Sequence, residues 1–454
     1  MDVNSNGTIV IGGGLAGLAA AVRLARAGRP VTVLEATRAG GGRSRSFHDS
    51  VLGREIDNGQ HLMMGCYHDT QAFLRTIGSE DDGVYYQRNL AVNMVRPGGK
   101  TVALACPALP APLHLAAGLL GMRGVGVWAK ATALRAGVML RNEVVRPDDN
   151  ETCDAWLHRM GQTVELRNTF WEPLIWAVLN EDPLVASAAM LVAVLDRAFM
   201  STRDASRLGV PRRPLSRLYV DHARAYLEAR GATVRFGAPV RAIEVEAGRA
   251  VGVRLRSGER CPADTIISAV PPHALLSLLP TSTKQHWAFA DVARLETSPI
   301  VNLWAVVSRP LFEGPFVGLV GSPLHWLFDR DQIDPLPGRE GHLISVTISG
   351  ARGYVHDDVA ALEGLFESEA RRFFPSRDFK LLRFRAVKEK RATISHAAGT
   401  YHRRPETKSP IPGLLLAGDW VRTGLPATIE SAVKSGHDAA AIALDHLPQA
   451  PARS

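Results

Sequence analysis

Residues 8–61 read TIVIGGGLAGLAAAVRLARAGRPVTVLEATRAGGGRSRSFHDSVLGREIDNGQH, and they begin with a strand and a glycine-rich loop. Thr8–Ile11 is short, apolar and β-branched, as expected of a buried parallel strand. In the loop that follows, Gly12 permits a tight turn, Gly14 lets the backbone approach a pyrophosphate, and Gly17 lets the next helix pack close to the strand. The pattern predicts a dinucleotide-binding loop.

The next helix and strand complete a βαβ unit. Leu15–Ala27 is rich in Ala and Leu and predicts a helix that ends near Gly28, with N-terminal N–H groups that attract phosphate. Val31–Leu34 is the second strand, and Glu35 ends it where an acid bonds ribose hydroxyls. A carboxylate there disfavours a 2′-phosphate and therefore NADP. An ordinary βαβ unit with a chance glycine pattern fits less well, because strand, loop, helix and acid agree.

A second glycine cluster, Gly40–Arg43, favours FAD over NAD. A glycine loop with one Arg can lie along the far side of the pyrophosphate and place a cation there. Taken alone, the cluster also fits a flexible surface loop. With the first motif it predicts FAD as the cofactor, with Gly42 and Arg43 among its contacts.

Length, net charge and cysteine content limit the classes of protein to which this chain can belong. A chain of 454 residues is long enough for two domains with their own cores. The net charge of +8 comes without a dense Lys/Arg run or a DNA- or RNA-binding motif, so we expect no nucleic-acid partner. The four cysteines lack CxxC or metal-ligand spacing, which predicts reduced thiols in a cytoplasmic protein and no metal site.

The most apolar stretch is Ala103–Trp128, which prolines and charged residues interrupt before it reaches the ~18–20 residues of a membrane span. Lys130, Arg135 and Arg141 follow it. Two interpretations stay open. The stretch is either an interfacial element that rests on a membrane and admits an apolar substrate, or a buried pair of helices. The first interpretation predicts a protein that lies peripherally on the inner face of the membrane, in addition to the cytoplasmic location expected from the cysteines.

The remaining pattern predicts two domains. The expected elements are helices over 69–77, 214–230 and 357–374, a mainly helical region over 105–205, a hairpin over 90–95 and 101–104, and strands over 233–236, 240–246, 250–255, 265–268, 301–307 and 343–348. The strands over 240–268 suit a small antiparallel meander and a return to the parallel sheet. We assign 1–88, 225–275 and 410–450 to a discontinuous cofactor-binding domain, and 89–224 and 276–409 to a substrate-binding domain.

The C-terminal stretch returns to the cofactor. Residues 413–420, GLLLAGDW, predict a buried strand that ends in Gly418-Asp419, and Asp419 is expected to bond the ribityl or phosphate region. A long helix follows, with Pro426 in its first turn, and its N-terminus would stabilise negative charge on reduced flavin. By themselves these residues equally fit a structural strand and helix. The predicted FAD contacts are Gly12, Gly14, Leu15, Ala16, Gly17, Glu35, Ala36, Gly42, Arg43, Val240, Gly418, Asp419, Ala427, Thr428 and Ile429.

Both ends of the chain and the central meander resemble the flavin-containing amine oxidase and phytoene desaturase superfamily. The resemblance implies an α/β fold: a Rossmann-like FAD-binding domain with an inserted α+β substrate domain. Within that group, DNGQHLMMGCYHDT (57–70) and GDWVRTGLPATIESAVKSG (418–436) resemble the hydroxysqualene dehydroxylases. That family implies an FAD-dependent oxidoreductase that removes the hydroxyl of hydroxysqualene and gives squalene for hopanoid or carotenoid synthesis.

The implied reaction assigns roles to particular residues. Hydride from N5 of reduced flavin would quench an allylic cation, and departure of the hydroxyl needs a proton donor. His61 is the first candidate, Gln60 is expected to bond the flavin or the hydroxyl, and Glu430 and Glu172 are weaker alternatives as the donor. The helical region over 105–205 would supply an apolar tunnel, although each candidate for its lining also fits ordinary core. The candidates are Phe170, Trp171, Trp176, Met190, Leu191 and Phe199. The sequence holds no second GxGxxG with a suitable acid, so the electron donor is an unidentified partner or a transiently bound reductant.

Three alternatives to this activity remain at the level of sequence. An oxidative isoprenoid desaturase uses the same fold. An amine oxidase of this superfamily presents an aromatic cage, whereas the comparable segment here offers Trp420 without an obvious pair. A non-enzymatic prenyl-lipid carrier would not need the intact set of Gly12, Glu35, Arg43 and Asp419, which therefore argues for a bound cofactor.

Overall fold

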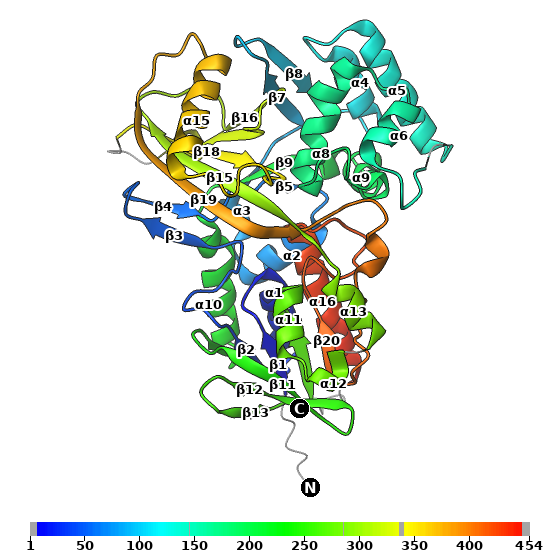
Figure 1. Cartoon of the computed structure of the whole chain (residues 1–454), viewed down its shortest axis with the longest axis vertical. Coiled ribbons are helices and arrows are strands. Elements are labelled where there is room, and N and C mark those ends of the chain that lie inside the picture. The colour runs from blue at the N-terminus through cyan, green and yellow to red at the C-terminus, as the bar shows by residue number, and fades with distance from the viewer. Residues whose placement is uncertain (1–6, 145, 285, 336–339, 447–454) are drawn as a thin grey trace.

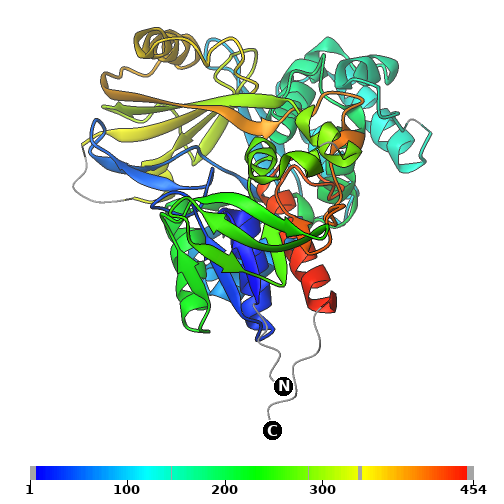
Figure 2. The same cartoon turned by 60° about the horizontal axis from the view of Figure 1, so that its bottom comes forward.

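The computed structural model describes residues 7–144, 146–284, 286–335 and 340–446, so the end of the predicted 410–450 segment lies outside the described residues. Two parts are stacked along the long axis of the molecule (Figure 1). The lower part contains the first strands and the C-terminal helix, and the upper part contains a mixed sheet beside a group of helices. Figure 2 shows this sheet and these helices on opposite sides of the upper part.

A five-stranded parallel sheet forms the centre of the lower part, in the order β10-β2-β1-β14-β20. Its strands are β1 (Thr8–Ile11), β2 (Val31–Leu34), β10 (Thr233–Arg235), β14 (Thr265–Ser268) and β20 (Leu414–Leu416). Every residue of β1 and β14 is buried, because both faces of a parallel sheet are covered. The order confirms that the middle and the end of the chain return to the N-terminal strands.

Helices cover one face of this sheet and the meander covers the other. On the first face lie α1 (Leu15–Arg26), α10 (His222–Glu228) and α16 (Ile429–His446), packed on Val10, Val33 and Ile267. On the second face lies the antiparallel sheet of β11 (Val240–Glu246), β12 (Arg249–Leu255) and β13 (Arg260–Pro262), packed on Ile9, Ile11 and Ile266. Leu215 and Leu218 belong to the first core, so this layer begins ahead of residue 225.

A seven-stranded mixed sheet forms one side of the upper part, in the order β19-β15-β18-β17-β16-β7-β8. Its strands are β7 (Ala91–Val95), β8 (Thr101–Ala105), β15 (Thr297–Val307), β16 (Phe316–Leu319), β17 (Trp326–Asp329), β18 (His342–Ile348) and β19 (Leu381–Ile394). The expected hairpin and the strands over 301–307 and 343–348 are confirmed. Helix α15 (Val359–Phe373) packs through Leu362 and Phe366 on one face of the sheet. The opposite face of the sheet is not covered by α15.

The region over 105–205 is mainly helical, as predicted. It contains α4 (Leu113–Gly121), α5 (Val127–Arg141), α6 (Cys153–Arg159), α7 (Val164–Leu166), α8 (Glu172–Leu179) and α9 (Ala188–Leu195), with π-helical turns at Arg167–Trp171 and Asp196–Met200. These helices share one apolar core with β7, β8 and the side chains Phe316 and Phe328 of the mixed sheet. In the part of the chain that the structure describes, none of the helices combines the length and apolarity needed to cross a bilayer.

The remaining elements are short, and α11 and α13 among them pack in the same core as the meander. They are β3 (Ser46–Asp49), β4 (Arg54–Asp57), β5 (Met63–Met64), α2 (His68–Ile77), α3 (Glu80–Gly83), β6 (Val84–Tyr86), β9 (Leu208–Pro211), α11 (Pro272–Leu278), α12 (Thr281–Lys284), α13 (Trp287–Ala293) and α14 (Arg330–Ile333), with 3-10 or π-helical turns at Asp204–Ser206, Ser216–Asp221 and Tyr401–Arg403. The predicted helix over 69–77 is confirmed, and Gly78 ends it in the left-handed conformation.

The start of the C-terminal helix differs from the prediction. Helix α16 begins at Ile429, so Pro426 lies in the turn before it rather than in its first turn. The Thr428 hydroxyl accepts a hydrogen bond from Ser431 N at 3.3 Å and so caps the helix. The Ala427 N–H is already committed to His396 Nε2 at 2.7 Å. Both contacts hold residues 426–428 outside the helix.

Candidate active site

One cavity of about 1140 Å³ extends from the glycine loop of the lower part to the mixed sheet of the upper part. It brings together nearly all of the predicted FAD contacts, which come from both ends of the chain and from the meander. Those that line it are Gly12, Gly14, Leu15, Ala16, Glu35, Ala36, Gly42, Arg43, Val240, Gly418, Asp419, Ala427, Thr428 and Ile429. Gln60 and His61 line it as well.

The glycine loop has the shape that a pyrophosphate requires. Gly12 has a φ of +107°, which favours glycine. A Cβ on Gly14 would meet no atom within 4 Å, so open space lies beside this backbone. Gly17 is outside the cavity lining, and a Cβ there would lie 2.0 Å from the Gly12 carbonyl oxygen. Gly17 therefore acts by letting α1 approach the loop, and these features fit the phosphates of FAD.

Glu35 ties the glycine loop to the end of β2. One carboxylate oxygen accepts a hydrogen bond from Gly13 N at 2.8 Å, and the other accepts one from Thr37 N at 2.8 Å. The carboxylate also lines the cavity. This position is compatible with the expected contact to the ribose, which stays a prediction.

Arg43 and Asp419 close the cofactor end of the cavity from opposite ends of the chain. Arg43 Nη2 lies 2.7 Å from Asp419 Oδ1, and Arg43 Nη1 donates to the Ala392 carbonyl at 2.5 Å. The ion pair joins the second glycine cluster to the Gly418-Asp419 turn. A cation and an anion are thus held together at the place where the sequence predicts the phosphates and the ribityl chain.

The DNGQH segment is fixed at the junction of the two parts. His61 Nδ1 lies 2.8 Å from the Gly59 carbonyl oxygen, so Nδ1 carries the hydrogen and donates it. Gln60 Oε1 accepts from Arg330 Nη1 at 3.2 Å. Asp57 Oδ1 accepts from the Ser46 hydroxyl at 2.6 Å. Within the described part of the chain, His61 Nε2 makes no hydrogen bond and is available to a substrate.

Burial sets the protonation of His61. It lowers the pKa of the imidazole, while the nearby Asp57 carboxylate and the hydrogen bond to Gly59 act in the opposite direction. Burial also raises the pKa of Asp57, against the effect of Arg330. The neutral imidazole with its hydrogen on Nδ1 is therefore the main form at neutral pH, and the protonated form becomes common only in acid.

Glu430 and Glu172 do not join this site. Neither lines the cavity among the residues that the structure describes. Glu430 is 2% exposed, and its carboxylate accepts hydrogen bonds from Asp69 N, Thr70 N and the Thr70 hydroxyl at 2.7–2.9 Å. Glu430 therefore binds the first turn of α2. This structural role, rather than proton donation, accounts for its position.

The far end of the cavity is apolar. Phe170, Trp176 and Phe199 line it, as the sequence predicts, whereas Trp171, Met190 and Leu191 pack in the helical core instead. The wall also contains Leu62, Met64, Leu90, Val92, Met94, Leu104, Met122, Leu174, Val178, Leu208, Ile300, Asn302, Trp326, Phe328 and Thr347, together with the polar residues Thr169, Asn180 and Ser349. The strand residues among them are absent from the sequence-based prediction, because it assigned the tunnel to the helical region alone.

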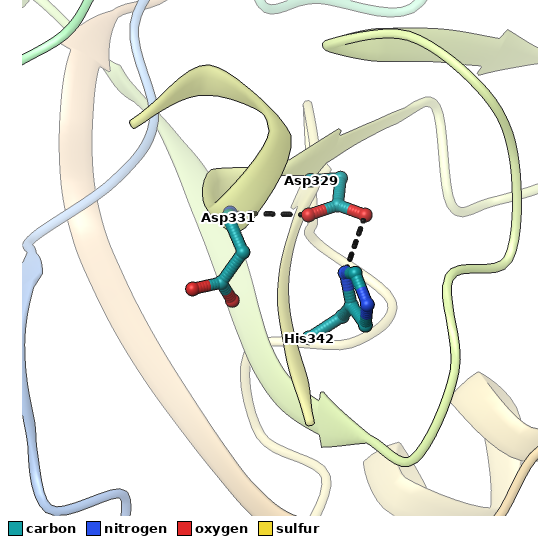
Figure 3. Close-up of side chains that lie close together, drawn as sticks. All are labelled: Asp329, Asp331 and His342. Carbon is teal, nitrogen blue, oxygen red and sulfur yellow. Dashed lines mark hydrogen bonds and ion pairs between the residues drawn. The ribbon is translucent and has the colours of Figure 1, made fainter. Parts of the chain in front are cut away.

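A cluster of Asp329, Asp331 and His342 lies at the start of α14 (Figure 3). Asp329 Oδ1 accepts from the backbone N–H groups of Asp331 and Gln332 at 3.1 Å, and Asp329 Oδ2 lies 3.2 Å from His342 Nδ1. Asp331 Oδ2 accepts from Arg54 at 2.8 Å. These contacts cap α14 and attach it to β4 and β18, which accounts for the cluster structurally.

Comparison with known proteins identifies the class. Residues 15–444 match the family described as "Flavin containing amine oxidoreductase", and the chain belongs to this family of FAD-dependent oxidoreductases. A solved oxidoreductase from Methanosarcina mazei has the same fold, with a TM-score of 0.76 at 18% identity over 95% of this chain and 99% of that one. The predicted α/β class, a Rossmann-like FAD-binding domain with an inserted substrate domain, is confirmed, and so is FAD as the cofactor.

Curated relatives place the chain more narrowly. It is similar to the hydroxysqualene dehydroxylase of Rhodopseudomonas palustris, with 32% identity over 96% of this chain and 97% of that protein. A 15-cis-phytoene desaturase of Synechococcus elongatus is more distant, with 24% identity over 94% of this chain and 93% of that protein. Within the superfamily, the chain groups with the hydroxysqualene dehydroxylases.

Proposed function

We propose that the protein reductively removes the hydroxyl of hydroxysqualene and releases squalene and water. The observation that carries the proposal is one cavity whose lining includes nearly all of the predicted FAD contacts, residues Gln60 and His61, and a long apolar wall. Reduced FAD supplies a hydride when it is bound. The hydroxyl leaves with a proton as water, and the hydride fills the vacant position on the allylic carbon, so that atoms and charge balance.

His61 is the proposed proton donor for the departing hydroxyl. The Gly59 carbonyl holds Nδ1–H, and in the protonated ring Nε2–H is then available for transfer. Because burial lowers its pKa, the imidazolium is a stronger acid than an exposed one. Arg330 fixes the amide of Gln60 next to it. Bound FAD would receive its electrons from a partner or a transiently bound reductant.

Product analysis tests the activity. The purified flavoprotein is reduced without oxygen, mixed with hydroxysqualene and analysed by mass spectrometry, and squalene is the expected product. Absence of squalene, together with reduction of the oxidised flavin by a less conjugated polyene, would instead indicate an oxidative desaturase.

We further propose that α4 and α5 rest on a membrane surface, from which the substrate enters. Leu113 and Leu120 of α4 are each 57% exposed, and Val127 and Trp128 of α5 are 83% and 76% exposed. Met122, between the two helices, lines the apolar end of the cavity. The same stretch buries Leu115, Leu119 and Ala129, so it serves both as packing and as an exposed apolar face.

Vesicle sedimentation tests this surface. Val127→Ser and Trp128→Ser together should reduce binding to anionic phospholipid vesicles, because the variant loses exposed apolar side chains. Trp287→Ser is the matched control, since Trp287 is 73% exposed on α13. Equal loss of binding in both variants, or no loss in the first, would contradict the proposal.

A further inference from the structure

Polar side chains interrupt the apolar wall of the cavity, among them Thr169, Asn180, Asn302, Thr347 and Ser349. Two of these side chains form a pair. Asn302 of β15 and Thr347 of β18 are directly opposite each other in the antiparallel register, and both line the cavity. Residues alternate between the faces of a strand, so Val301 and Leu303 point instead into the core beneath α15. Phe328 lines the cavity from the neighbouring strand. A polar pair at this position is unnecessary for holding a hydrocarbon.

The hydrogen bonds of Asn302 and Thr347 leave donor and acceptor groups available to a ligand. Asn302 is 4% exposed, and its Nδ2 donates one hydrogen to the Asn58 carbonyl at 3.1 Å. The Thr347 hydroxyl donates its hydrogen to Asn302 Oδ1 at 3.3 Å. An amide nitrogen has two hydrogens and a hydroxyl oxygen has two lone pairs. One Nδ2 hydrogen and the acceptor capacity of Thr347 therefore have no partner among the described residues.

The pair lies against the segment that carries the proposed proton donor. A Cβ on Gly59 would lie 2.6 Å from Asn302 Nδ2, so this amide packs directly on the Gly59 backbone. The carbonyl of Gly59 in turn holds the His61 ring. Asn302 and His61 are thus attached to the same short stretch of backbone, and both face one cavity.

We propose that Asn302 and Thr347 recognise the hydroxyl of the substrate and present it to His61. The inference rests on the proposed function and extends it to substrate specificity. Asn302 Nδ2 donates to the hydroxyl oxygen, and Thr347 Oγ1 accepts the hydroxyl hydrogen. Squalene lacks this group, so the product loses both contacts when the C–O bond breaks. The pair thereby favours binding of the alcohol and release of the hydrocarbon.

Binding to the oxidised FAD-loaded enzyme tests this inference without turnover. Dissociation constants for hydroxysqualene and squalene are measured by quenching of protein or flavin fluorescence. The wild-type enzyme should prefer the alcohol, and Thr347→Val, a change of similar shape, should reduce the preference about tenfold while the affinity for squalene stays the same. Asn302→Leu should reduce it at least as much. Thr76→Val, the same change on α2 outside the cavity lining, is the control and should keep the wild-type preference.

The outcomes separate the two proposals. An unchanged preference in Thr347→Val would overturn the role of the pair, even when the wild-type enzyme produces squalene. A wild-type enzyme that forms no squalene would instead overturn the proposed function. If Asn302→Leu fails to retain FAD because the Asn58 contact is lost, Thr347→Val decides the question, since it leaves that contact in place.

Discussion

His61 should give the reaction a characteristic pH dependence. Only the protonated ring can donate from Nε2, and burial lowers the pKa of the ring below its ordinary value. The rate constant for squalene formation in a single turnover should therefore rise as the pH falls and level off below this pKa. His61→Gln should slow the step about 100-fold and abolish the pH dependence. Rapid mixing of the reduced enzyme with substrate at several pH values provides the measurement.

A surface histidine serves as the control for this prediction. His48 is exposed on β3, away from the residues that line the cavity, so His48→Gln should preserve both the rate and its pH dependence. A His61→Gln variant with the wild-type pH profile would exclude His61 as the donor.

Glu430 should matter for stability. Glu430→Ala removes the acceptor for two backbone N–H groups and the Thr70 hydroxyl. Because buried donors without partners are costly, the free energy of unfolding should fall by about 3 kcal/mol. Denaturant titration measures this loss. Glu367→Ala, which removes one exposed contact to Arg371 at 3.6 Å, should change it by under about 0.5 kcal/mol. Equal effects would contradict the assigned role.

At the scale of elements, two glycines should behave differently. A Cβ on Gly436 would lie 2.1 Å from the Ala16 carbonyl oxygen, so Gly436→Ala should push α16 away from α1 and destabilise the fold by about 1–3 kcal/mol. A Cβ on Gly14 would meet nothing within 4 Å. Gly14→Ala should therefore leave the fold intact but weaken FAD binding, because the methyl group enters the space beside the glycine loop.

Thermal unfolding of the FAD-free proteins and FAD titration separate these effects. Gly436→Ala should lower the unfolding temperature, whereas Gly14→Ala should lower only the affinity for FAD. The reverse pattern would contradict the assignment of Gly14 to the cofactor site and of Gly436 to helix packing.

At the scale of the whole molecule, FAD should stabilise the entire fold. Its predicted contacts come from the first strands, the meander and the C-terminal turn, and Arg43 and Asp419 join the two ends of the chain. Free FAD at 100 times its dissociation constant should add about 2.7 kcal/mol to the free energy of unfolding. Thermal unfolding with increasing FAD measures this gain, and a transition unaffected by FAD would argue against a site built from both ends.

The sequence predicts the lower part of the molecule well because its signals are local. A strand, the Gly12 loop, a helix and Glu35 follow one another within one βαβ unit, and their chemistry depends on that order. The Gly418-Asp419 turn also follows a buried strand, and the N-terminal motifs identify it as part of the cofactor site. Nearly all of the predicted FAD contacts therefore line the cavity. Lining residues from more distant elements, such as Arg256, His273 and Glu389, are absent from the prediction, because no local motif marks them.

The substrate end is harder to predict because it depends on long-range pairing. Asn302 and Thr347 become neighbours only when β15 and β18 align, and neither residue stands out in its strand. The start of α16 depends on His396, which lies far away in sequence and binds Ala427 N. The role of Glu430 likewise depends on α2, so its position on the helix alone could not distinguish a proton donor from a cap.

The most direct test of the proposed reaction is a single anaerobic turnover. Enzyme with its FAD fully reduced is mixed with one equivalent of hydroxysqualene, and flavin oxidation is followed by absorbance while squalene is quantified by mass spectrometry. One squalene should form for each flavin oxidised, and both should appear at the same rate. Flavin that stays reduced in the presence of bound hydroxysqualene, or flavin oxidised without squalene, would contradict it.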